Sequence, residues 1–206
     1  MARQYNISKV VYASSSSVYG LNTKVPFSLE DKTNTPISLY AATKKYNELV
    51  AHVYHHLYGT KMVGLRFFTV YGPWGRPDIA YYKFTKAILE GKSIDVYNNG
   101  DMRRDFTYIT DIVNGVITSI DRDFEYEIFN LGNSNAVTLK YFIECIEKEL
   151  GQEAQKNYLG MQLGDVKETY ADIKESKEKL DFEPKTKIED GIKEFVKWYK
   201  KYYKID

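Results

Sequence analysis

The order strand, helix, strand near the start of the chain constrains the fold more than any other feature. A β-branched run, KVVYASSSS, begins at Lys9 and stops in four serines, as a buried parallel strand and its loop do. Residues 39–58 place apolar side chains at helical spacing between Ser38, a candidate N-cap, and Gly59, which ends the helix. Residues 61–68, KMVGLRFF, are typical of a second buried strand. Because parallel neighbours are joined by crossover helices, this order predicts an α/β protein with a doubly wound parallel sheet.

Shorter elements are expected along the rest of the chain. The patterns predict helices over 79–90, 111–121, 139–150, 172–180 and 188–202, and strands around a turn within 91–109 and over 126–132. Residues 69–78, TVYGPWGRPD, hold two glycines and two prolines, so we expect this loop to lack regular structure. The apolar positions of the first long helix are Leu39, Ala42, Tyr46, Leu49, Val53 and Leu57.

Charge and cysteine content exclude several classes of function. The 206 residues contain 29 Lys+Arg and 28 Asp+Glu, so no broad field exists to drive nonspecific binding to nucleic acid or anionic lipid. Cys145 is the single cysteine, and His52, His55 and His56 have no cysteine or acidic cluster beside them, so we expect no disulfide and no metal site. Neither a secretion signal nor an apolar run of membrane-spanning length occurs, which favours a cytoplasmic protein without nucleic-acid or membrane partners.

Tyr40 and Lys44 are the first candidates for chemistry. They stand four residues apart on the predicted helix and therefore share a face. A phenol is a weak base at neutral pH because its ordinary pKa is about 10, and a neighbouring ammonium favours the phenolate. The spacing itself is not specific, since it occurs four times in the sequence. This helix, however, follows a strand that ends in Ser14–Ser17, at the carboxyl edge of the predicted sheet, where ligands bind in such folds.

Four motifs in order carry a resemblance to a known family. They are ASSSSVYG (13–20), PISLYAATK (36–44), LRFFTVYGPWGRPD (65–78) and GDMRRDFTYITDI (100–112). With them the chain resembles the extended short-chain dehydrogenase/reductase family, in particular its NAD-dependent nucleotide-sugar epimerases and most closely the UDP-glucuronate 4-epimerases. The resemblance implies that residues 1–74 are the C-terminal part of an NAD-binding Rossmann domain. Residues 75–206 would mainly form a smaller mixed α/β substrate-binding domain, with 105–132 returning to the Rossmann sheet.

The resemblance also implies a catalytic set around the serine loop. The family's catalytic Ser/Thr stands four positions before the tyrosine of V-Y-G, which is Ser15 here, and its hydroxyl would hydrogen-bond the sugar 4-oxygen. Tyr40 would take the 4-hydroxyl proton while NAD takes the C4 hydride, and Lys44 would bind the nicotinamide ribose. Phe68 would lie beside the nicotinamide, unless it is a core aromatic at the strand end. Return of the hydride to the other face of a rotated 4-keto sugar would invert C4.

Substrate contacts are implied for a second set of residues. Besides Ser15, they are Thr69, Arg76, Tyr97, Arg104, Gln162 and Asp165. The first two would contact the sugar, and the guanidinium of Arg76 suits a C6 carboxylate. Arg104 would bind the diphosphate, Tyr97 would lie against the uracil, and the last two would reach the nucleotide from a late loop. As alternatives, the serines form a polar loop, and Arg76 and Arg104 are solvated surface charges.

The serine loop also discriminates between reactions of the family. Dehydratases carry an Asp-Glu pair directly after the catalytic Ser/Thr, and UDP-glucuronate decarboxylases place a glutamate in this loop. This chain has Ser16 and Ser17 there. Because hydroxyls are weak acids and bases at neutral pH, the loop favours epimerisation over both alternatives.

One family motif is missing from the sequence. A G-x-x-G-x-x-G turn should bind the cofactor diphosphate, and an acidic residue after the next strand should bind the adenosine ribose, but neither is found. We therefore expect an N-terminally truncated epimerase that is inactive alone, a homodimer for the complete enzyme, and association or aggregation of the fragment through its open sheet edge. The alternatives are a noncatalytic nucleotide-sugar-binding remnant, or a 4-epimerase of UDP-glucose or UDP-N-acetylhexosamine.

Overall fold

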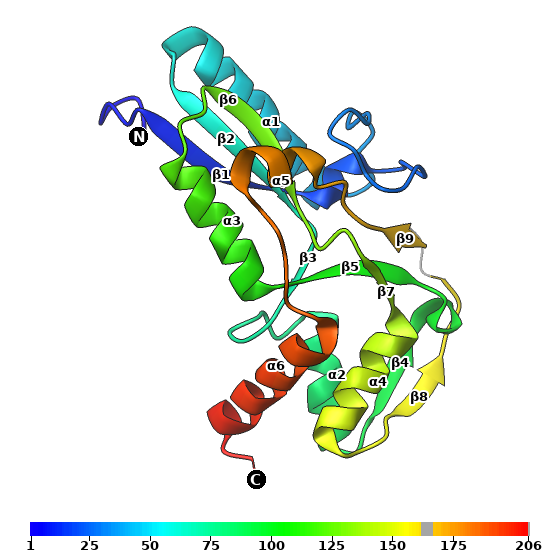
Figure 1. The fold of residues 1–206 in the computed structure, drawn as a ribbon. Coiled ribbons are helices and arrows are strands. Elements are labelled where there is room, and N and C mark those ends of the chain that lie inside the picture. Colours follow the sequence, from blue (N-terminus) through cyan, green and yellow to red (C-terminus); the bar gives the residue numbers. More distant parts are fainter. Residues whose placement is uncertain (162–166, 206) are drawn as a thin grey trace.

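A three-stranded parallel sheet forms one part of the computed structural model, which describes residues 1–161 and 167–205 (Figure 1). Its strands β1 (Lys9–Ser15), β2 (Lys61–Phe67) and β6 (Tyr126–Leu131) lie in the order β1-β2-β6. In this register Ser15 is level with Phe67, which is level with Leu131, so the three carboxyl ends meet at one edge. The predicted α/β fold with a parallel sheet is confirmed.

Helix α1 (Leu39–Tyr58) forms the crossover between β1 and β2 and has both predicted caps. The Ser38 side chain accepts a hydrogen bond from the Ala41 amide at 3.1 Å, and Gly59 adopts a left-handed conformation whose N–H bonds the His55 carbonyl. The apolar stripe of α1, by contrast, is not its buried face. Leu39, Tyr46, Leu49, Val53 and Leu57 are exposed, and the helix buries Ala41, Glu48 and Ala51.

The two faces of this sheet differ in chemistry. On one face, Val63 and Leu65 pack with Ile112 of α3 (Ile109–Asp121) in an apolar cluster that also holds Phe129 of β6. Side chains of a strand alternate between faces, and on the other face Arg66 contacts Glu48 of α1. α1 is therefore attached to the sheet in part by polar contacts of Glu48, whereas α3 is attached by apolar packing.

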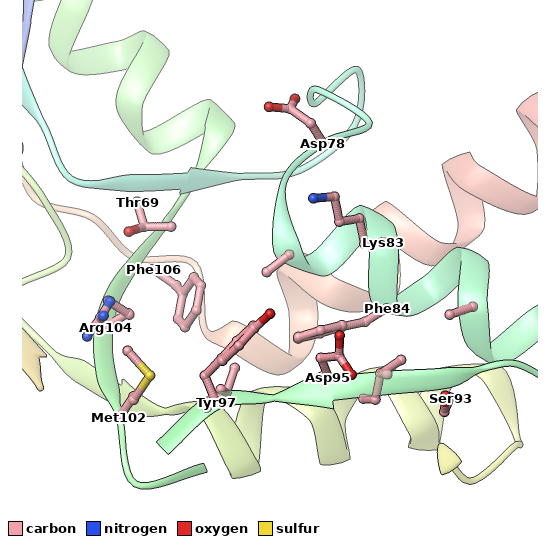
Figure 2. A pocket seen from close by; sticks show the side chains of 14 residues that line it. Thr69, Asp78, Lys83, Phe84, Ser93, Asp95, Tyr97, Met102, Arg104 and Phe106 are labelled. Carbon is pink, nitrogen blue, oxygen red and sulfur yellow. The ribbon is translucent and has the colours of Figure 1, made fainter. Parts of the chain in front are cut away.

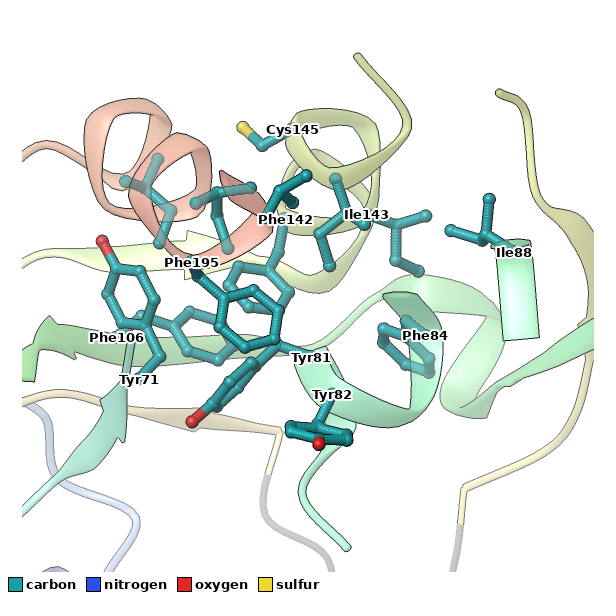
Figure 3. Close-up of a cluster of buried hydrophobic side chains, with 14 of the residues drawn as sticks. Tyr71, Tyr81, Tyr82, Phe84, Ile88, Phe106, Phe142, Ile143, Cys145 and Phe195 are labelled. Carbon is teal, nitrogen blue, oxygen red and sulfur yellow. The ribbon is translucent and has the colours of Figure 1, made fainter. Parts of the chain in front are cut away.

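A second part of the molecule surrounds the largest apolar cluster. Its four-stranded sheet contains β3 (Thr69–Tyr71), β5 (Arg103–Tyr108), β7 (Ala136–Thr138) and β9 (Glu168–Thr169), and β4 (Ser93–Val96) pairs with β8 (Gln155–Tyr158). Helices α2 (Ala80–Leu89), α4 (Leu139–Leu150) and α6 (Ile188–Tyr203) pack together beside them (Figure 1). In the cluster Phe106 and Phe142 stack at 4.0 Å, and Phe195 meets Tyr81 edge-on at 4.7 Å (Figure 3).

Short elements complete the chain. They are the 3₁₀ turns η1 (Ser16–Tyr19) and η2 (Tyr97–Gly100) and helix α5 (Lys174–Leu180). The expectation that residues 69–78 lack regular structure is wrong for the first three, because Thr69–Tyr71 pair in parallel with Phe106–Tyr108 of β5. The irregular segment begins at Gly72, whose φ is 141°. Among the helices of the described part, none is long and apolar enough to cross a bilayer.

Candidate functional site

A cavity of about 580 Å³ opens at the carboxyl edge of β1 and β2. The loops that leave parallel strands all begin at this edge, which is why ligands bind there in open parallel sheets. Six of the residues predicted from the sequence line this cavity: Ser15, Tyr40, Lys44, Phe68, Thr69 and Arg76. Residues that are up to 61 positions apart in the sequence therefore share one surface, as the topology predicts.

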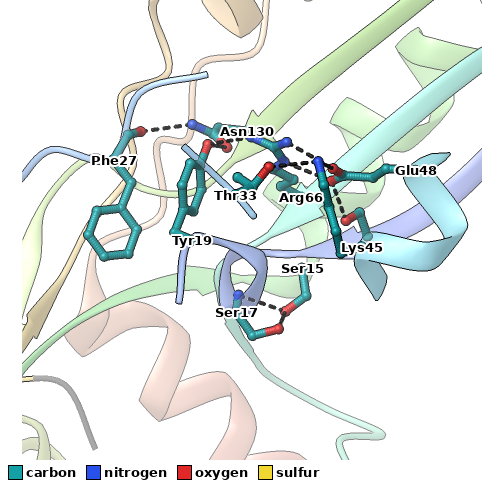
Figure 4. Close-up of polar contacts among 10 residues, drawn as sticks. Ser15, Ser17, Tyr19, Phe27, Thr33, Lys45, Glu48, Arg66 and Asn130 are labelled. Carbon is teal, nitrogen blue, oxygen red and sulfur yellow. Dashed lines mark hydrogen bonds and ion pairs between the residues drawn. The ribbon is translucent and has the colours of Figure 1, made fainter. Parts of the chain in front are cut away.

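Ser15 ends β1 and caps η1, which fixes its hydroxyl (Figure 4). Its oxygen accepts hydrogen bonds from the Ser17 amide at 3.2 Å and from the Ser17 hydroxyl at 3.0 Å. A hydroxyl has two acceptor lone pairs and one hydrogen to donate. Both bonds use lone pairs of Ser15 Oγ, so its hydrogen remains suited to donate to a ligand in the cavity.

Tyr40 and Lys44 begin α1 on the cavity side. The Tyr40 side chain is not packed into the core, since the residue is 55% exposed. The Lys44 ammonium donates a hydrogen bond to the carbonyl of Ala13 in β1 at 3.1 Å and lies 5.7 Å from the centre of the Tyr40 ring. A cation is thus held between the Tyr40 ring and β1, the strand that carries the serines.

A second cavity, of about 530 Å³, adjoins the first (Figure 2). Thr69 lines both cavities, and Tyr97 and Arg104 line the second together with the apolar side chains of Met102 and Phe106. An aromatic ring and a guanidinium in one cavity suit a base joined to a phosphate group, because the ring offers a stacking face and the guanidinium a bidentate donor.

The structure separates the two adjacent arginines. Arg104 lines the second cavity, and its Nη1 donates to the carbonyls of Arg103 and Lys167. Arg103 instead donates to the Ala136 carbonyl and lies 3.4 Å from the carboxylate of Glu168. Gln162 and Asp165, which the sequence also places near the nucleotide, lie outside the described residues.

Comparison with known proteins identifies the family. The sequence model described as "NAD dependent epimerase/dehydratase family" matches residues 1–132, more than half of the chain. The chain belongs to this family.

Relatives and solved structures of the family agree. An uncharacterized protein of Methanocaldococcus jannaschii, MJ1055, is 63% identical over 96% of this chain and 61% of that protein. UDP-glucuronate 4-epimerase 4 of Arabidopsis thaliana is 49% identical over 96% of this chain and 49% of its own length. The UDP-glucuronic acid 4-epimerase of Bacillus cereus, solved with UDP-glucuronic acid and NAD, is 34% identical with a TM-score of 0.88, covering 95% of this chain and 62% of that one. The chain thus spans about half to two thirds of the length of these proteins.

A buried polar network attaches α1 to the sheet, and the sequence analysis missed it (Figure 4). Glu48 of α1 accepts two hydrogen bonds from the guanidinium of Arg66, at 2.8 and 2.9 Å, and one from the hydroxyl of Ser14 at 2.7 Å. Arg66 also donates to the hydroxyl of Tyr19, which donates to the side chain of Asn130. The network connects β1, η1, α1, β2 and β6, and so fixes the helix that carries Tyr40 relative to the serine loop.

Electrostatics within this network favour the ion pair. Burial by itself raises the pKa of Glu48, but the hydrogen bonds and charge of Arg66, with smaller contributions from Ser14 and Lys45, hold that pKa below its usual value. The sequence did contain a signal for it. Arg66 stands inside an otherwise apolar strand, and a charge at such a position needs a buried partner.

Asp105 is a second residue that the analysis missed, although it belongs to the R-D-F motif. It is fully buried and accepts hydrogen bonds from the amides of Asn133, Ser134 and Ala171 and from the hydroxyl of Thr107. Burial raises the pKa of its carboxyl, and these hydrogen bonds oppose that effect. Asp105 therefore fixes the loops that follow β6 and β9 against β5, next to the cavity residue Arg104.

Proposed function

We propose that this chain is the substrate-side part of an NAD-dependent nucleotide-sugar 4-epimerase that acts on a UDP-hexuronic acid, interconverting UDP-glucuronate and UDP-galacturonate. The observation that carries the proposal is the shared cavity of Ser15, Tyr40, Lys44 and Arg76, joined at Thr69 to the cavity of Arg104. The resemblance of the chain to UDP-glucuronate 4-epimerases supports it.

In this proposal the sugar lies at the carboxyl edge of β1 with its 4-hydroxyl between two side chains. Ser15, whose oxygen already accepts two hydrogen bonds from Ser17, donates its own hydrogen to the sugar 4-oxygen. Tyr40 takes the proton of the 4-hydroxyl as a general base, and the ammonium of Lys44 lies beside its ring. The same tyrosine returns the proton after the ring has turned.

The residues around the first cavity fit the nicotinamide end of NAD. Tyr40 and Lys44 line one surface, which offers a hydroxyl and an ammonium; Phe68 also borders it but is 5% exposed and packs with Tyr19 and Phe27 as a core aromatic. When bound, NAD would accept a hydride from C4 of the sugar and return it. The sequence has no glycine-rich turn of the G-x-x-G-x-x-G type to bind the cofactor diphosphate. We therefore propose that the isolated chain binds the UDP-sugar but has no appreciable affinity for NAD and does not epimerise.

We place the nucleotide end of the substrate in the second cavity, which Tyr97 and Arg104 line. The guanidinium of Arg104 pairs with the diphosphate, and the ring of Tyr97 lies against the uracil. Arg76, which pairs only loosely with Asp78 at 3.5 Å, binds the C6 carboxylate at the other end. The carboxylate contact distinguishes the proposed substrate from UDP-glucose and UDP-N-acetylhexosamines, which carry no charge at C6.

Domain division and association remain part of the proposal. Residues 1–74 would belong to the Rossmann domain and 75–206 mainly to the substrate-binding domain, with 105–132 returning to the sheet through β6, which pairs with β2.

In the described sheet β1 pairs with β2 on one side only, so its outer edge can accept another strand. We propose that the isolated chain associates through this edge, and that sedimentation will detect species larger than a monomer.

Calorimetric titration of the purified chain tests the assignment. UDP-glucuronate should bind more tightly than UDP-glucose, by about tenfold if one charge-assisted contact distinguishes them. Equal affinities would reject the hexuronic acid, and no binding of UDP or any UDP-sugar would reject the proposed function. Incubation with UDP-glucuronate and NAD, followed by chromatography, tests the inactivity of the chain, which the appearance of UDP-galacturonate would contradict.

A further inference from the structure

The segment between β3 and α2 carries an unusual tryptophan at the rim of the first cavity. Trp74 is 75% exposed and has a φ of 63°, in the left-handed region that bulky side chains rarely adopt. Arg76, the residue assigned to the sugar carboxylate, follows two positions later and lines the same cavity. A backbone in this conformation persists only where its surroundings hold it, so the contacts of Trp74 decide where Arg76 stands.

Helix α6 supplies these contacts. The ring of Trp74 lies 5.3 Å from that of Trp198 and 5.4 Å from that of Tyr202, and the latter two rings stack at 5.2 Å. Because Trp198 and Tyr202 are four residues apart on one helix, they present a continuous aromatic face. We call Trp74, Trp198 and Tyr202 the aromatic clamp.

The inner side of the segment is held by α2. The hydroxyl of Tyr81 donates a hydrogen bond to the Gly72 carbonyl at 3.4 Å, and a Cβ at Gly75 would lie only 1.7 Å from the same hydroxyl. The segment is therefore held at Gly72 and Gly75 by Tyr81 and at Trp74 by the rings of α6. Among the described residues that line the first cavity, none belongs to α6, so this helix acts on the cavity through lining residues that pack against it, which include Trp74 and Tyr81.

We propose that the aromatic clamp positions Arg76 and thereby sets the preference of the site for a sugar that carries a carboxylate. This inference rests on the proposed function. The Arg76 side chain is 75% exposed and its neighbouring contact, with Asp78, is also exposed, so side-chain packing does little to orient it. Fixing the backbone at Trp74 reduces the conformational freedom that Arg76 loses when an anion binds, which favours the charged sugar over the neutral one. Trp198 and Tyr202 are thus positioning residues that do not touch the substrate.

Two adjacent tyrosines of α6 give a matched test. Tyr202 belongs to the clamp, contacts Trp74 and is 52% exposed, whereas Tyr203 is 46% exposed and its ring contacts are with Tyr82, Tyr199 and the edge of Tyr202. In calorimetric titrations Tyr202→Leu and Trp198→Leu should weaken UDP-glucuronate binding by about tenfold while changing UDP-glucose binding less than about twofold. Tyr202→Phe, which keeps the ring, should restore the preference, and Tyr203→Leu should leave it unchanged. An unchanged ratio in both clamp variants, or an equal loss in Tyr203→Leu, overturns the proposal.

A measurement without ligand separates this inference from the proposed function. Amide hydrogen exchange over residues 72–79 should be faster in Tyr202→Leu than in the wild-type chain and unchanged in Tyr203→Leu. Exchange that is equal in all three proteins overturns the clamp even if UDP-sugars bind. Faster exchange in Tyr202→Leu together with no binding of any UDP-sugar by the wild-type chain rejects the proposed function instead.

Discussion

Replacing Glu48 by glutamine tests whether the buried network holds the helix that carries Tyr40. The substitution keeps the volume of the side chain but removes the charge that faces Arg66, which is 4% exposed and would remain as a buried cation. Removal of one partner from a buried, hydrogen-bonded ion pair costs about 3–5 kcal/mol. For a chain of this size that loss corresponds to a fall in melting temperature of roughly 6–20 °C.

Urea unfolding followed by circular dichroism measures this loss. The matched control is Glu90→Gln, which removes the exposed pair with Lys92 and should change the free energy of unfolding by less than about 1 kcal/mol. If Glu48→Gln costs no more than Glu90→Gln, the network does not stabilise the fold and does not position α1.

The pH dependence of the same pair has a definite sign. The pKa of Glu48 is lower in the folded chain than its usual value of 4.5, so its contribution to stability is present above about pH 4.5 and is lost as the pH falls through the lower folded pKa. The difference in unfolding free energy between wild type and Glu48→Gln should therefore shrink below about pH 4. A difference that stays constant from neutral to strongly acidic pH would contradict the assigned charge state.

Three further substitutions test the site. Tyr40→Phe, introduced into a fusion of this chain with a glycine-rich cofactor-binding segment so that turnover can be measured by chromatography, should abolish epimerisation and leave UDP binding intact. Retained turnover would remove the role of Tyr40 as the base. Arg104→Ala should weaken UDP binding by about tenfold in calorimetry. Arg103→Ala should leave UDP binding unchanged, because the side chain of Arg103 contacts Ala136 and Glu168 instead. Gly75→Ala should lower the free energy of unfolding by about 1–3 kcal/mol, because its Cβ would meet the Tyr81 hydroxyl. An unchanged free energy in urea unfolding would show that the segment shifts to make room for the added methyl group.

Local signals explain what the sequence could predict. The caps at Ser38 and Gly59 set the bounds of α1, and two apolar runs set β1 and β2. From the parallel order alone it follows that the serine loop and Tyr40 meet at one sheet edge. These features depend on residues close together in the chain, and the structure confirms each of them.

Contacts between distant residues explain what the sequence could not predict. The stripe of α1 led to the wrong face because Glu48 is buried against Arg66, 18 positions later, and the charge inside β2 does not reveal which residue is its partner. β3 has three residues and exists because Phe106–Tyr108 lie beside it. Arg103 and Arg104 are adjacent on β5 and so point to opposite faces of its sheet, but which of them borders the cavity depends on distant contacts such as that of Arg103 with Ala136.

Thr69 connects the two ends of the proposed substrate in a way that limits how the site can change. Its side chain contributes to the wall of both cavities, whereas Arg76 and Arg104 each serve one. An arginine can therefore be exchanged to retune one end of the ligand independently of the other. A larger or smaller residue in place of Thr69 would change the shape of both cavities at once. Variants with altered sugar preference are therefore more readily sought at Arg76 than at Thr69.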